Sequence, residues 1–215
     1  MSPTPCRLCG EGTAPFRTPD GAVYHECPAC GFVGLEEERH PTVEAARERY
    51  LQHQNFSTQA GYVAMLDKFI ESCVSPFAAT GDAILDFGCG PEPVLMGLLD
   101  KRGYRADAYD PLFRPDESYR GRAYDLVVLT EVLEHLTDPL ETLQDILPVL
   151  KPGGHLAAQT LFRPAGREAF GEWWYRRDST HVSFFNQRSA ETLGKALGLG
   201  KVWSDGKQWV VWIKE

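Results

Sequence analysis

Two pairs of cysteines within residues 1–40 have a spacing that suits the coordination of one metal ion. Cys6 and Cys9 form one Cys-x-x-Cys pair, Cys27 and Cys30 form the other, and seventeen residues separate the pairs. Two residues between thiolates allow one tight turn to present both sulfurs, and the glycine after each pair permits the left-handed residue of such a turn. Four thiolates complete a tetrahedral shell, so we predict a structural zinc site. Disulfide bonds, redox chemistry and another metal are the alternatives.

A glycine-rich loop after a buried strand carries the second candidate chemistry. The apolar run 83–87 leads into a Gly-Cys-Gly loop at 88–90, and a helical stretch follows. This order is typical of nucleotide-type cofactor sites, because glycines let the backbone approach the ligand. Asp110 lies twenty residues past Gly90, where a carboxylate can accept hydrogen bonds from ribose hydroxyls. Glu92 would repel a phosphate at the start of the helix, which disfavours a dinucleotide.

Five motifs that follow one another in the chain resemble those of class I methyltransferases, which use S-adenosylmethionine (SAM), a cofactor without phosphate. They are Leu85-Asp86-Phe87-Gly88-Cys89-Gly90, Asp110, Tyr124-Asp125-Leu126-Val127, Glu131-Val132-Leu133-Glu134-His135 and Leu150-Lys151-Pro152-Gly153-Gly154. The resemblance covers residues 82–161 and implies an α/β fold with a Rossmann-like methyltransferase sheet.

The resemblance also implies a role for individual residues in binding SAM. The methionine side of the cofactor would be lined by Asp86, Gly88 and Gly90. Asp110 would bind the ribose, and Thr130 and Glu131 would lie beside the methionine moiety or the transferred methyl group. The chain departs from the family pattern after Asp110, because only a short stretch precedes Tyr124. We therefore expect a sheet that is shortened at this edge, with Leu112 or Phe113 over the adenine.

The acceptor side of the site is expected in an aromatic segment that runs from Trp173 to Phe185. Aromatic side chains with a few polar groups suit a concave site for a small molecule. His181 is the candidate catalytic base and Asp178 the residue that would orient it, although a purely structural role for His181 is the alternative. His135 is expected to be structural. From the N-terminal region, the side chains expected to reach SAM or the acceptor are Tyr50, His53 and Tyr62.

The pattern of apolar residues divides the chain into three segments. They are a zinc-ribbon element (1–40), a helical cap or linker (41–80) and a SAM-binding methyltransferase domain (81–215). Helices are predicted from Thr42 and over 58–74, 94–102, 139–150 and 187–197. Strands are predicted over 83–87, 104–109, 124–129, 155–161, 201–203 and 208–213, with a turn at 151–154.

Composition limits the classes of partner. The 215 residues carry a formal net charge of −8, which disfavours nonspecific binding to nucleic acid, because such binding needs Lys and Arg against phosphates. Residues 1–40 offer only Arg7, Arg17 and Arg39 as fixed cations. The start of the chain does not read as a signal peptide, and no segment reaches the roughly 20 apolar residues of a membrane span. We expect a cytoplasmic protein without a membrane partner.

Three functions fit these observations. The first is a SAM-dependent methyltransferase that acts on a small molecule, which the acidic charge and the aromatic segment favour. The second is an RNA or protein methyltransferase that uses the zinc ribbon to recognise its substrate. The third is a SAM-binding module without catalysis, which the intact cofactor loop disfavours. The acceptor, the acceptor atom and the oligomeric state stay open.

Overall fold

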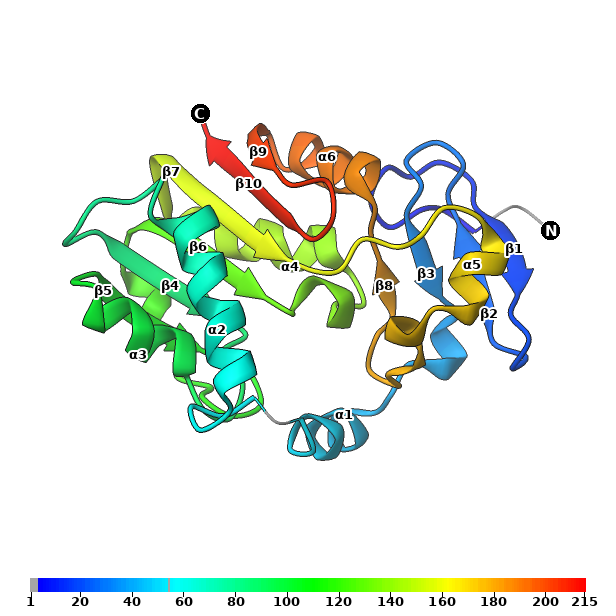
Figure 1. Cartoon of the computed structure of the whole chain (residues 1–215). Helices are drawn as coiled ribbons and strands as arrows, with labels where there is room; N and C mark the ends of the chain where they lie inside the picture. Colours follow the sequence, from blue (N-terminus) through cyan, green and yellow to red (C-terminus); the bar gives the residue numbers. More distant parts are fainter. Residues whose placement is uncertain (1–3, 54) are drawn as a thin grey trace.

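The longest apolar runs of the chain form a six-stranded mixed sheet in the computed structural model, which describes residues 4–53 and 55–215 (Figure 1). From one edge to the other, the strands are β5 (Arg105–Tyr109), β4 (Ala83–Phe87), β6 (Tyr124–Thr130), β7 (Leu150–Gln159), β10 (Trp209–Lys214) and β9 (Leu199–Ser204). The first four are parallel, whereas β10 runs antiparallel to β7 and to β9. Within the described residues the sheet ends at β5, as the short stretch after Asp110 predicts.

Both faces of this sheet are apolar because successive strand residues point to opposite sides. Ile84 packs in a core with α2 (Ala60–Phe69) and α3 (Val94–Lys101). Its neighbour Leu85 packs in the opposite core with α4 (Pro139–Ile146) and α6 (Gln187–Ala196). The sheet is therefore the buried middle layer of a three-layer α/β unit.

A second, smaller sheet contains the N-terminal element. It consists of β1 (Ala14–Arg17), β2 (Val23–Glu26), β3 (Val33–Leu35) and β8 (Ser183–Phe184), all paired antiparallel. The strand β8 belongs to the segment 81–215, so the methyltransferase part of the chain completes the sheet of the N-terminal part (Figure 1). Phe32 packs against Phe185 with ring centroids 5.3 Å apart, which joins the two sheets through one core.

The remaining helices are short. They are α1 (Val43–Tyr50), α5 (Arg167–Glu172), the 3-10 turns η1 (Glu37–Arg39), η3 (Glu117–Gly121), η4 (Leu133–His135), η5 (Leu147–Val149) and η6 (Trp174–Arg177), and the π-helical turn η2 (Ile70–Val74). Thr42 caps α1 through its side chain, as the sequence predicts. No helix among the described residues is long and apolar enough to cross a membrane.

One predicted boundary was wrong. The predicted turn at 151–154 is the first part of β7, which begins at Leu150. The pairing of β6 with β7 shifts register between Tyr124 and Leu126, and Gly153 has a φ of 75°. The irregularity therefore lies inside the strand as a bulge, which sequence signals do not distinguish from a turn.

The connections of the parallel strands define where a ligand can bind. From β4, the strand next to the edge strand β5, the chain first adds β5 on one side and then returns to add β6 on the other. Crevices in open α/β sheets form at such a point, beyond the carboxyl ends of the strands. The residues that the sequence assigns to the cofactor lie in the last residues of β4 and β6 and in the loops that follow β4, β5 and β6.

Candidate active site and cysteine cluster

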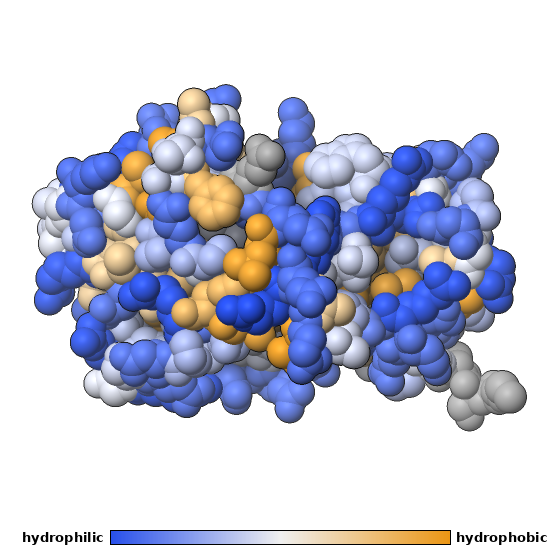
Figure 2. Space-filling view, turned by 90° about the horizontal axis from the view of Figure 1, so that it is seen from below, coloured by the Kyte–Doolittle hydropathy of each residue, from blue (hydrophilic) through white to orange (hydrophobic). Residues whose placement is uncertain are grey.

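A cavity of about 1110 Å³ lies at the carboxyl ends of β4, β5, β6 and β7. It is lined by the cofactor loop, by residues of α1 and α2, and by the aromatic segment after β7. Figure 2 views the molecule from the side on which α1 lies, and apolar side chains gather around the middle of this face. Val43 and Trp174, both lining residues, are 63% and 67% exposed. The mouth of the cavity is therefore apolar.

Most of the predicted site residues surround this one cavity. The lining includes Gly88, Gly90, Asp110, Thr130, Glu131 and His181. Asp86 is not among the lining residues and is buried in β4. The expected adenine neighbours Leu112 and Phe113 also line the cavity, and so do the cap residues Tyr50, His53 and Tyr62. These placements are consistent with the predicted roles without testing them.

The cofactor loop has the conformation that its glycines predict. Gly88 and Gly90 have φ values of 81° and 69°, a region that side chains disfavour. A Cβ atom on Gly88 would lie 2.5 Å from Cγ2 of Val132. A Cβ on Gly90 would meet nothing within 4 Å, so the backbone there is open. The loop is thus a cradle that a ligand can approach at backbone distance.

Asp110 fixes the loop from the neighbouring strand. Its Oδ2 accepts a hydrogen bond from the backbone N–H of Gly90 at 3.0 Å, and its Oδ1 accepts from Leu112 at 2.8 Å and Phe113 at 3.1 Å. Each carboxylate oxygen has two lone pairs, so Oδ2 of Asp110 can still accept one bond from a ribose hydroxyl. It therefore orders the loop and remains available to a ligand.

Asp86 carries an unpaired acceptor. The side chain is 1% exposed, and its Oδ1 has no hydrogen-bond partner. Burial, and secondly the charge of Asp110, raise the pKa of Asp86 to about 7. A buried acceptor without a donor is costly, and a cationic ligand at the loop would relieve that cost. SAM carries such charge on its sulfonium and ammonium groups, so the cradle, the free lone pair of Asp110 and the unpaired oxygen of Asp86 fit SAM.

Glu131 marks the bend where β6 enters the site. It has a φ of 54°, and it is the one described residue other than glycine with a positive φ. Its Oε1 accepts a hydrogen bond from Gln159 Nε2 at 3.0 Å, and its Oε2 lies 3.2 Å from the hydroxyl of Tyr175. Burial, and secondly the charge of Glu134, raise the pKa of Glu131 to about 8. The strained backbone therefore holds a half-buried carboxylate at the cavity wall.

Glu134, His135 and His181 form a compact polar group beside Glu131. The hydroxyl of Tyr175 donates to Oε1 of Glu134 at 2.5 Å. The rings of His135 and His181 have centroids 4.7 Å apart. Burial is the main cause that raises the pKa of Glu134 to about 7 and lowers the pKa values of His135 and His181 to about 4 and about 3. Both imidazoles are therefore neutral near pH 7.

Asp178 orients His53 and not His181, contrary to the prediction from sequence. His53 Nε2 donates to Asp178 Oδ2 at 3.0 Å, and Arg49 donates to the same oxygen at 2.8 Å. Burial alone would raise the pKa of Asp178, but the hydrogen bonds from His53, Thr180 and Arg49 hold it well below its usual range. Nδ1 of His181 instead donates to the backbone carbonyl of Tyr175 at 2.7 Å.

Sequence reasoning missed two residues of the site. Gln159 ends β7 and links Glu131 to the indole of Trp209, whose Nε1 donates to Gln159 Oε1 at 3.0 Å. Tyr175 bridges Glu131 and Glu134. A glutamine at the end of an otherwise apolar strand was a usable signal, because buried polar groups need partners. Tyr175 could not be singled out from the sequence, because it lies in a segment with several other aromatic residues.

The four paired cysteines converge on one point. Their Sγ atoms all lie within 4.8 Å of one another. Cys6 and Cys30 are 3.6 Å apart at Sγ, and Cys9 and Cys27 are 3.5 Å apart. A disulfide needs about 2.05 Å, whereas sulfurs about 2.3 Å from one zinc ion stand roughly 3.8 Å apart. The four cysteines are free of disulfide bonds, and the cluster suits a tetrahedral metal ion.

Each cysteine pair has the same turn geometry. The backbone N–H of Gly10 donates to the carbonyl of Cys6, and that of Gly31 donates to the carbonyl of Cys27. The φ of Gly10 is 75° and that of Gly31 is 80°. The glycine after each pair is thus required by a left-handed turn, as the spacing predicts.

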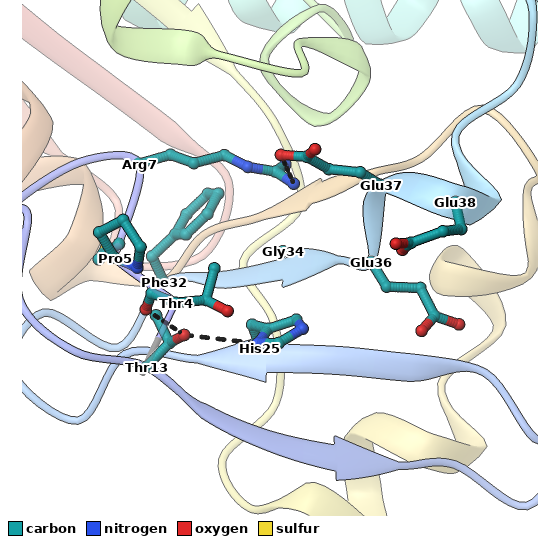
Figure 3. A pocket seen from close by; sticks show the side chains of 11 residues that line it. Thr4, Pro5, Arg7, Thr13, His25, Phe32, Gly34, Glu36, Glu37 and Glu38 are labelled. Carbon is teal, nitrogen blue, oxygen red and sulfur yellow. Dashed lines mark hydrogen bonds and ion pairs between the residues drawn. The ribbon is translucent and has the colours of Figure 1, made fainter. Parts of the chain in front are cut away.

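A second, smaller pocket lies beside the cysteine cluster. It has a volume of about 220 Å³, and Figure 3 shows Arg7 and Glu37 on one side and the Thr13–His25 contact on the other. His25 Nδ1 lies 3.4 Å from Thr13 Oγ1, and His40 Nε2 lies 3.1 Å from the carbonyl of Leu35. Neither histidine belongs to the cysteine group, so the four sulfurs stand alone as candidate ligands.

Comparison with known proteins identifies the family. A family profile described as a methyltransferase domain matches residues 51–203, which is more than half of the chain. The fold and the site define a class I methyltransferase, as the ordered motifs predict. The chain belongs to the methyltransferase domain family.

Individual relatives agree with this assignment. The ubiquinone biosynthesis O-methyltransferase of Vibrio cholerae is 48% identical over an alignment of 107 residues, and the match covers 39% of this chain and 43% of that enzyme. The chain spans less than half of the length of the curated relatives it matches. Among solved structures, an O-methyltransferase family 2 protein from Planctomyces limnophilus in complex with apigenin has a TM-score of 0.58 at 16% identity, covering 83% of this chain and 64% of its own.

A second solved structure shares the fold to a similar degree. It is a methyltransferase of calicheamicin biosynthesis in its SAH-bound form, with a TM-score of 0.52 and 16% identity, covering 71% of this chain and 54% of its own. At this level of identity, both structures establish the fold of the chain and nothing finer.

Proposed function

We propose that the chain is a SAM-dependent methyltransferase whose acceptor is a small and largely apolar molecule. The observation that carries this proposal is one cavity of about 1110 Å³ that is lined by both the cofactor loop and the aromatic segment. A site for one small molecule usually measures about 300–1,000 Å³. The cavity therefore has room for the cofactor and for a second molecule, and its mouth at Val43 and Trp174 favours an apolar one.

The residues of the chain have separate tasks in this proposal. When bound, SAM supplies a methyl group on a positively charged sulfur, and the S–CH3 bond breaks as the acceptor gains the methyl. Gly88 and Gly90 let the methionine part approach the backbone, and Asp110 accepts a hydrogen bond from the ribose. Asp86 and Glu131 are the acidic side chains toward the cationic end of SAM, whose positive charge would favour their ionised forms. His181 is a candidate for contact with the acceptor, since it lines the same cavity. Alignment in a water-poor pocket is the main source of acceleration for such a displacement.

The proposal includes structural zinc in the cysteine cluster. The sulfur separations of 3.5 and 3.6 Å support it, and so does the closed set of four thiolates, which leaves no position for a substrate. Leu8 and Cys30 donate backbone N–H bonds to sulfurs of the cluster, at 3.4 and 3.5 Å. Such donors stabilise thiolates. The ion would tie the N-terminal loops to the sheet that β8 completes.

An RNA acceptor is less favoured, because the arginines of the N-terminal element are engaged internally. Arg7 donates to the carbonyl of Leu35, Arg17 to that of Gly21, and Arg39 pairs with Glu36. Binding of a phosphate backbone requires a stripe of free cations. The described part of residues 1–40 offers no such stripe.

Calorimetry with SAM and S-adenosylhomocysteine (SAH) tests the cofactor. We expect binding by the wild type and a clear loss of affinity in Asp110→Ala. Asp107→Ala is the matched control, because Asp107 lies on β5, the strand that Asp110 follows, and pairs with Arg122 outside the cavity. Absence of SAM and SAH binding by the folded wild type would contradict the proposal, and unchanged affinity in Asp110→Ala would overturn the ribose assignment.

Transfer from SAM with a labelled methyl group tests the acceptor. Three sets of acceptors are compared, namely simple phenols and amines, bulk RNA, and bulk protein. Label in the small-molecule set supports the proposal. Label confined to RNA or to protein would replace it with the second function.

A further inference from the structure

The connection between β7 and α6 forms the aromatic wall of the cavity. This β7–α6 connection (residues 160–186) contains α5, η6 and β8. Leu161, Tyr175 and His181 are among its residues that line the cavity, whereas none of residues 4–40 does so. In Figure 1 the connection leaves the end of β7, runs to the N-terminal strands and returns to α6. The wall therefore lies outside the six-stranded sheet and needs support from another part of the chain.

A separate hydrophobic core supports this wall. Its buried members are four residues of the N-terminal element (residues 4–40) and four of the β7–α6 connection. The fully buried ring of Phe170 packs edge-on against the rings of Tyr24 and Phe184, with centroids 5.0 and 5.1 Å away. Among the described residues, all side chains of this core belong to these two parts of the chain. The apolar packing of the wall thus depends on the N-terminal element.

Backbone hydrogen bonds carry this support up to the cavity. Strand β8 pairs with β3, and the N–H of Leu35 donates to the carbonyl of Val182 at 2.9 Å. Val182 lines the cavity, and its own N–H donates to the carbonyl of Glu134 at 2.8 Å. A lining residue is therefore held between the N-terminal element and the turn after β6, so a shift of β3 would displace the wall.

Arg163 joins the start of the connection to the second cysteine turn. Its side chain is 7% exposed, its Nε donates to the carbonyl of Gly31 at 2.9 Å, and its Nη2 donates to Oε1 of Glu26 at 2.9 Å. Nδ2 of Asn186, at the end of the connection, donates to the same carbonyl at 3.4 Å. The N–H of Gly31 closes the turn that begins at Cys27. Both ends of the connection are therefore attached to a peptide that a metal ion in the cysteine cluster would fix.

Arg176 attaches the middle of the connection. Its side chain is 4% exposed, and its Nη1 donates to Oδ2 of Asp20 at 2.8 Å. Its Nε donates to the carbonyl of Gly171 at 2.8 Å. The hydrogen bond from Arg176 is the largest cause that lowers the pKa of Asp20 to about 2, so the pair is ionic at neutral pH. Since a buried charge without its partner is costly, the N-terminal element supplies a charge that the wall requires.

The cofactor side of the cavity has independent support. The N–H of Gly88 donates to the carbonyl of Tyr109 at 2.8 Å, and the N–H of Gly90 donates to Asp110. These bonds join the loop after β4 to β5 and the loop that follows it, without a residue of the N-terminal element. The two sides of the cavity can therefore respond differently when the N-terminal element changes.

We propose that the N-terminal element, closed by its metal ion, positions the β7–α6 connection and so determines the shape of the acceptor side of the cavity. Arg163 and Arg176 are the positioning residues. The inference rests on the proposed function, which assigns the cavity to SAM and an acceptor and the cysteine cluster to zinc. The N-terminal element then contributes to acceptor recognition from behind the wall. Loss of the ion weakens binding of the acceptor and leaves binding of the cofactor nearly unchanged.

Removal of zinc from the full chain tests this coupling without an acceptor. The metal is withdrawn with a chelator under reducing conditions, elemental analysis follows its loss, and hydrogen exchange is measured by mass spectrometry. We expect exchange in residues 160–186 to accelerate at least about tenfold, exchange in 83–110 to stay within about twofold, and added zinc to restore the slow rates. Unchanged exchange in 160–186 after zinc has left overturns the proposal, and so does equal acceleration in 83–110.

Substitutions of the two arginines that pair with Glu26 test the positioning role of Arg163. Arg163→Ala and Arg167→Ala each remove one of these ion pairs, but only Arg163 also reaches Gly31. Arg167, 47% exposed, is therefore the matched control. Arg163→Ala should accelerate exchange in 160–186 about tenfold at unchanged zinc content and SAH affinity, and Arg163→Lys should recover part of the protection through Glu26. Wild-type exchange in Arg163→Ala, or an equal effect in Arg167→Ala, overturns the proposal.

Kinetics separate positioning of the wall from general destabilisation. With the acceptor that the labelled-methyl assay identifies, Arg163→Ala should raise the KM of the acceptor at least about fivefold and leave the KM of SAM within about twofold. A rise of both KM values by the same factor overturns the proposal, because the two sides of the cavity would then share their support.

SAH binding and zinc analysis distinguish this proposal from the proposed function. If the folded wild type binds no SAH, the methyltransferase proposal fails, and exchange in Arg163→Ala still decides the positioning role. If the purified protein holds no zinc, the zinc assignment fails, and the same variant decides whether the N-terminal element supports the wall. If SAH and zinc both bind and exchange in 160–186 responds to neither change, the positioning proposal alone fails.

Discussion

The carboxylate of Asp178 lies 3.0 Å from Nε2 of His53, a residue 125 positions earlier in the chain. The same oxygen pairs with Arg49 at 2.8 Å. Helix α1, which carries Arg49, buries none of its residues. The bonds to Asp178 are thus the main polar attachment of this helix to the aromatic segment across the cavity.

Removal of this attachment should loosen α1 without unfolding the core. In Asp178→Ala, we expect amide hydrogen exchange in residues 43–53 to accelerate about tenfold, which corresponds to roughly 1.4 kcal/mol of local opening. Glu172→Ala is the control, because Glu172 is exposed and lies 3.7 Å from Arg177. Equal exchange in Asp178→Ala and wild type would show that other contacts hold the helix. Hydrogen exchange with mass spectrometry provides the measurement.

Stability and cofactor binding should respond in opposite directions to Asp86→Asn. The pKa of Asp86 is raised from 3.8 to about 7, so the folded protein holds a proton that the unfolded chain has lost over this range. Its contribution to stability is full below pH 4 and is lost as the pH rises through 7, at a cost of the order of a few kcal/mol. The asparagine side chain of Asp86→Asn does not ionise, so the variant does not lose this stability as the pH rises.

We therefore expect cofactor-free Asp86→Asn to melt at a higher temperature than wild type at pH 8, with little difference at pH 4. Its affinity for SAM should nevertheless fall, because a carboxylate is lost near a cation. The charged and titratable groups near Asp86 are Asp110, Tyr62 and Cys89. Thermal melts across pH 4–8 and calorimetry at pH 8 give both quantities. A lower melting temperature of Asp86→Asn than of wild type at pH 8 would show that the ionised Asp86 carboxylate does not destabilise the folded state.

A methyl group at Gly88 should abolish cofactor binding. The Cβ atom would lie 2.5 Å from Val132 Cγ2, and the φ of 81° disfavours any side chain. We expect Gly88→Ala to lose about 1–3 kcal/mol of stability and most of its affinity for SAH. Gly97→Ala in α3 is the control, since a Cβ there meets nothing within 4 Å. If Gly88→Ala bound SAH with wild-type affinity, the cofactor would not bind against the backbone of this loop.

Loss of one cysteine ligand should remove zinc and destabilise the N-terminal element. Elemental analysis of wild type should give one zinc ion per chain, and Cys27→Ser should lower that content and reduce the melting temperature, since metal binding contributes to folding. Cys73→Ala is the control, because Cys73 is buried in η2 outside the cluster. It should lose stability by leaving a cavity while the zinc content stays the same. Wild-type protein without stoichiometric metal would refute the zinc assignment.

Local patterns were enough to predict several parts of this protein. The Cys-x-x-Cys spacing fixes two turns that each involve a few neighbouring residues, and both turns are present. The loop at Gly88 and Gly90 follows from a buried strand that must end before a helix. These features depend on contacts that are close in sequence, so the residue types alone specify them.

Long-range contacts were decided by the tertiary structure. The pairing of Gly34 in β3 with Ser183 in β8, the bond from His53 to Asp178, and the meeting of His135 with His181 all join distant parts of the chain. Each polar side chain had several possible partners, and sequence reasoning chose the neighbour His181 for Asp178. Once these segments pack around a common core, each of these polar side chains lies within hydrogen-bonding distance of only some of its possible partners. The cysteine spacing and the cofactor loop are thus set by the sequence itself, whereas the aromatic side of the cavity forms only once the distant segments of the chain pack together.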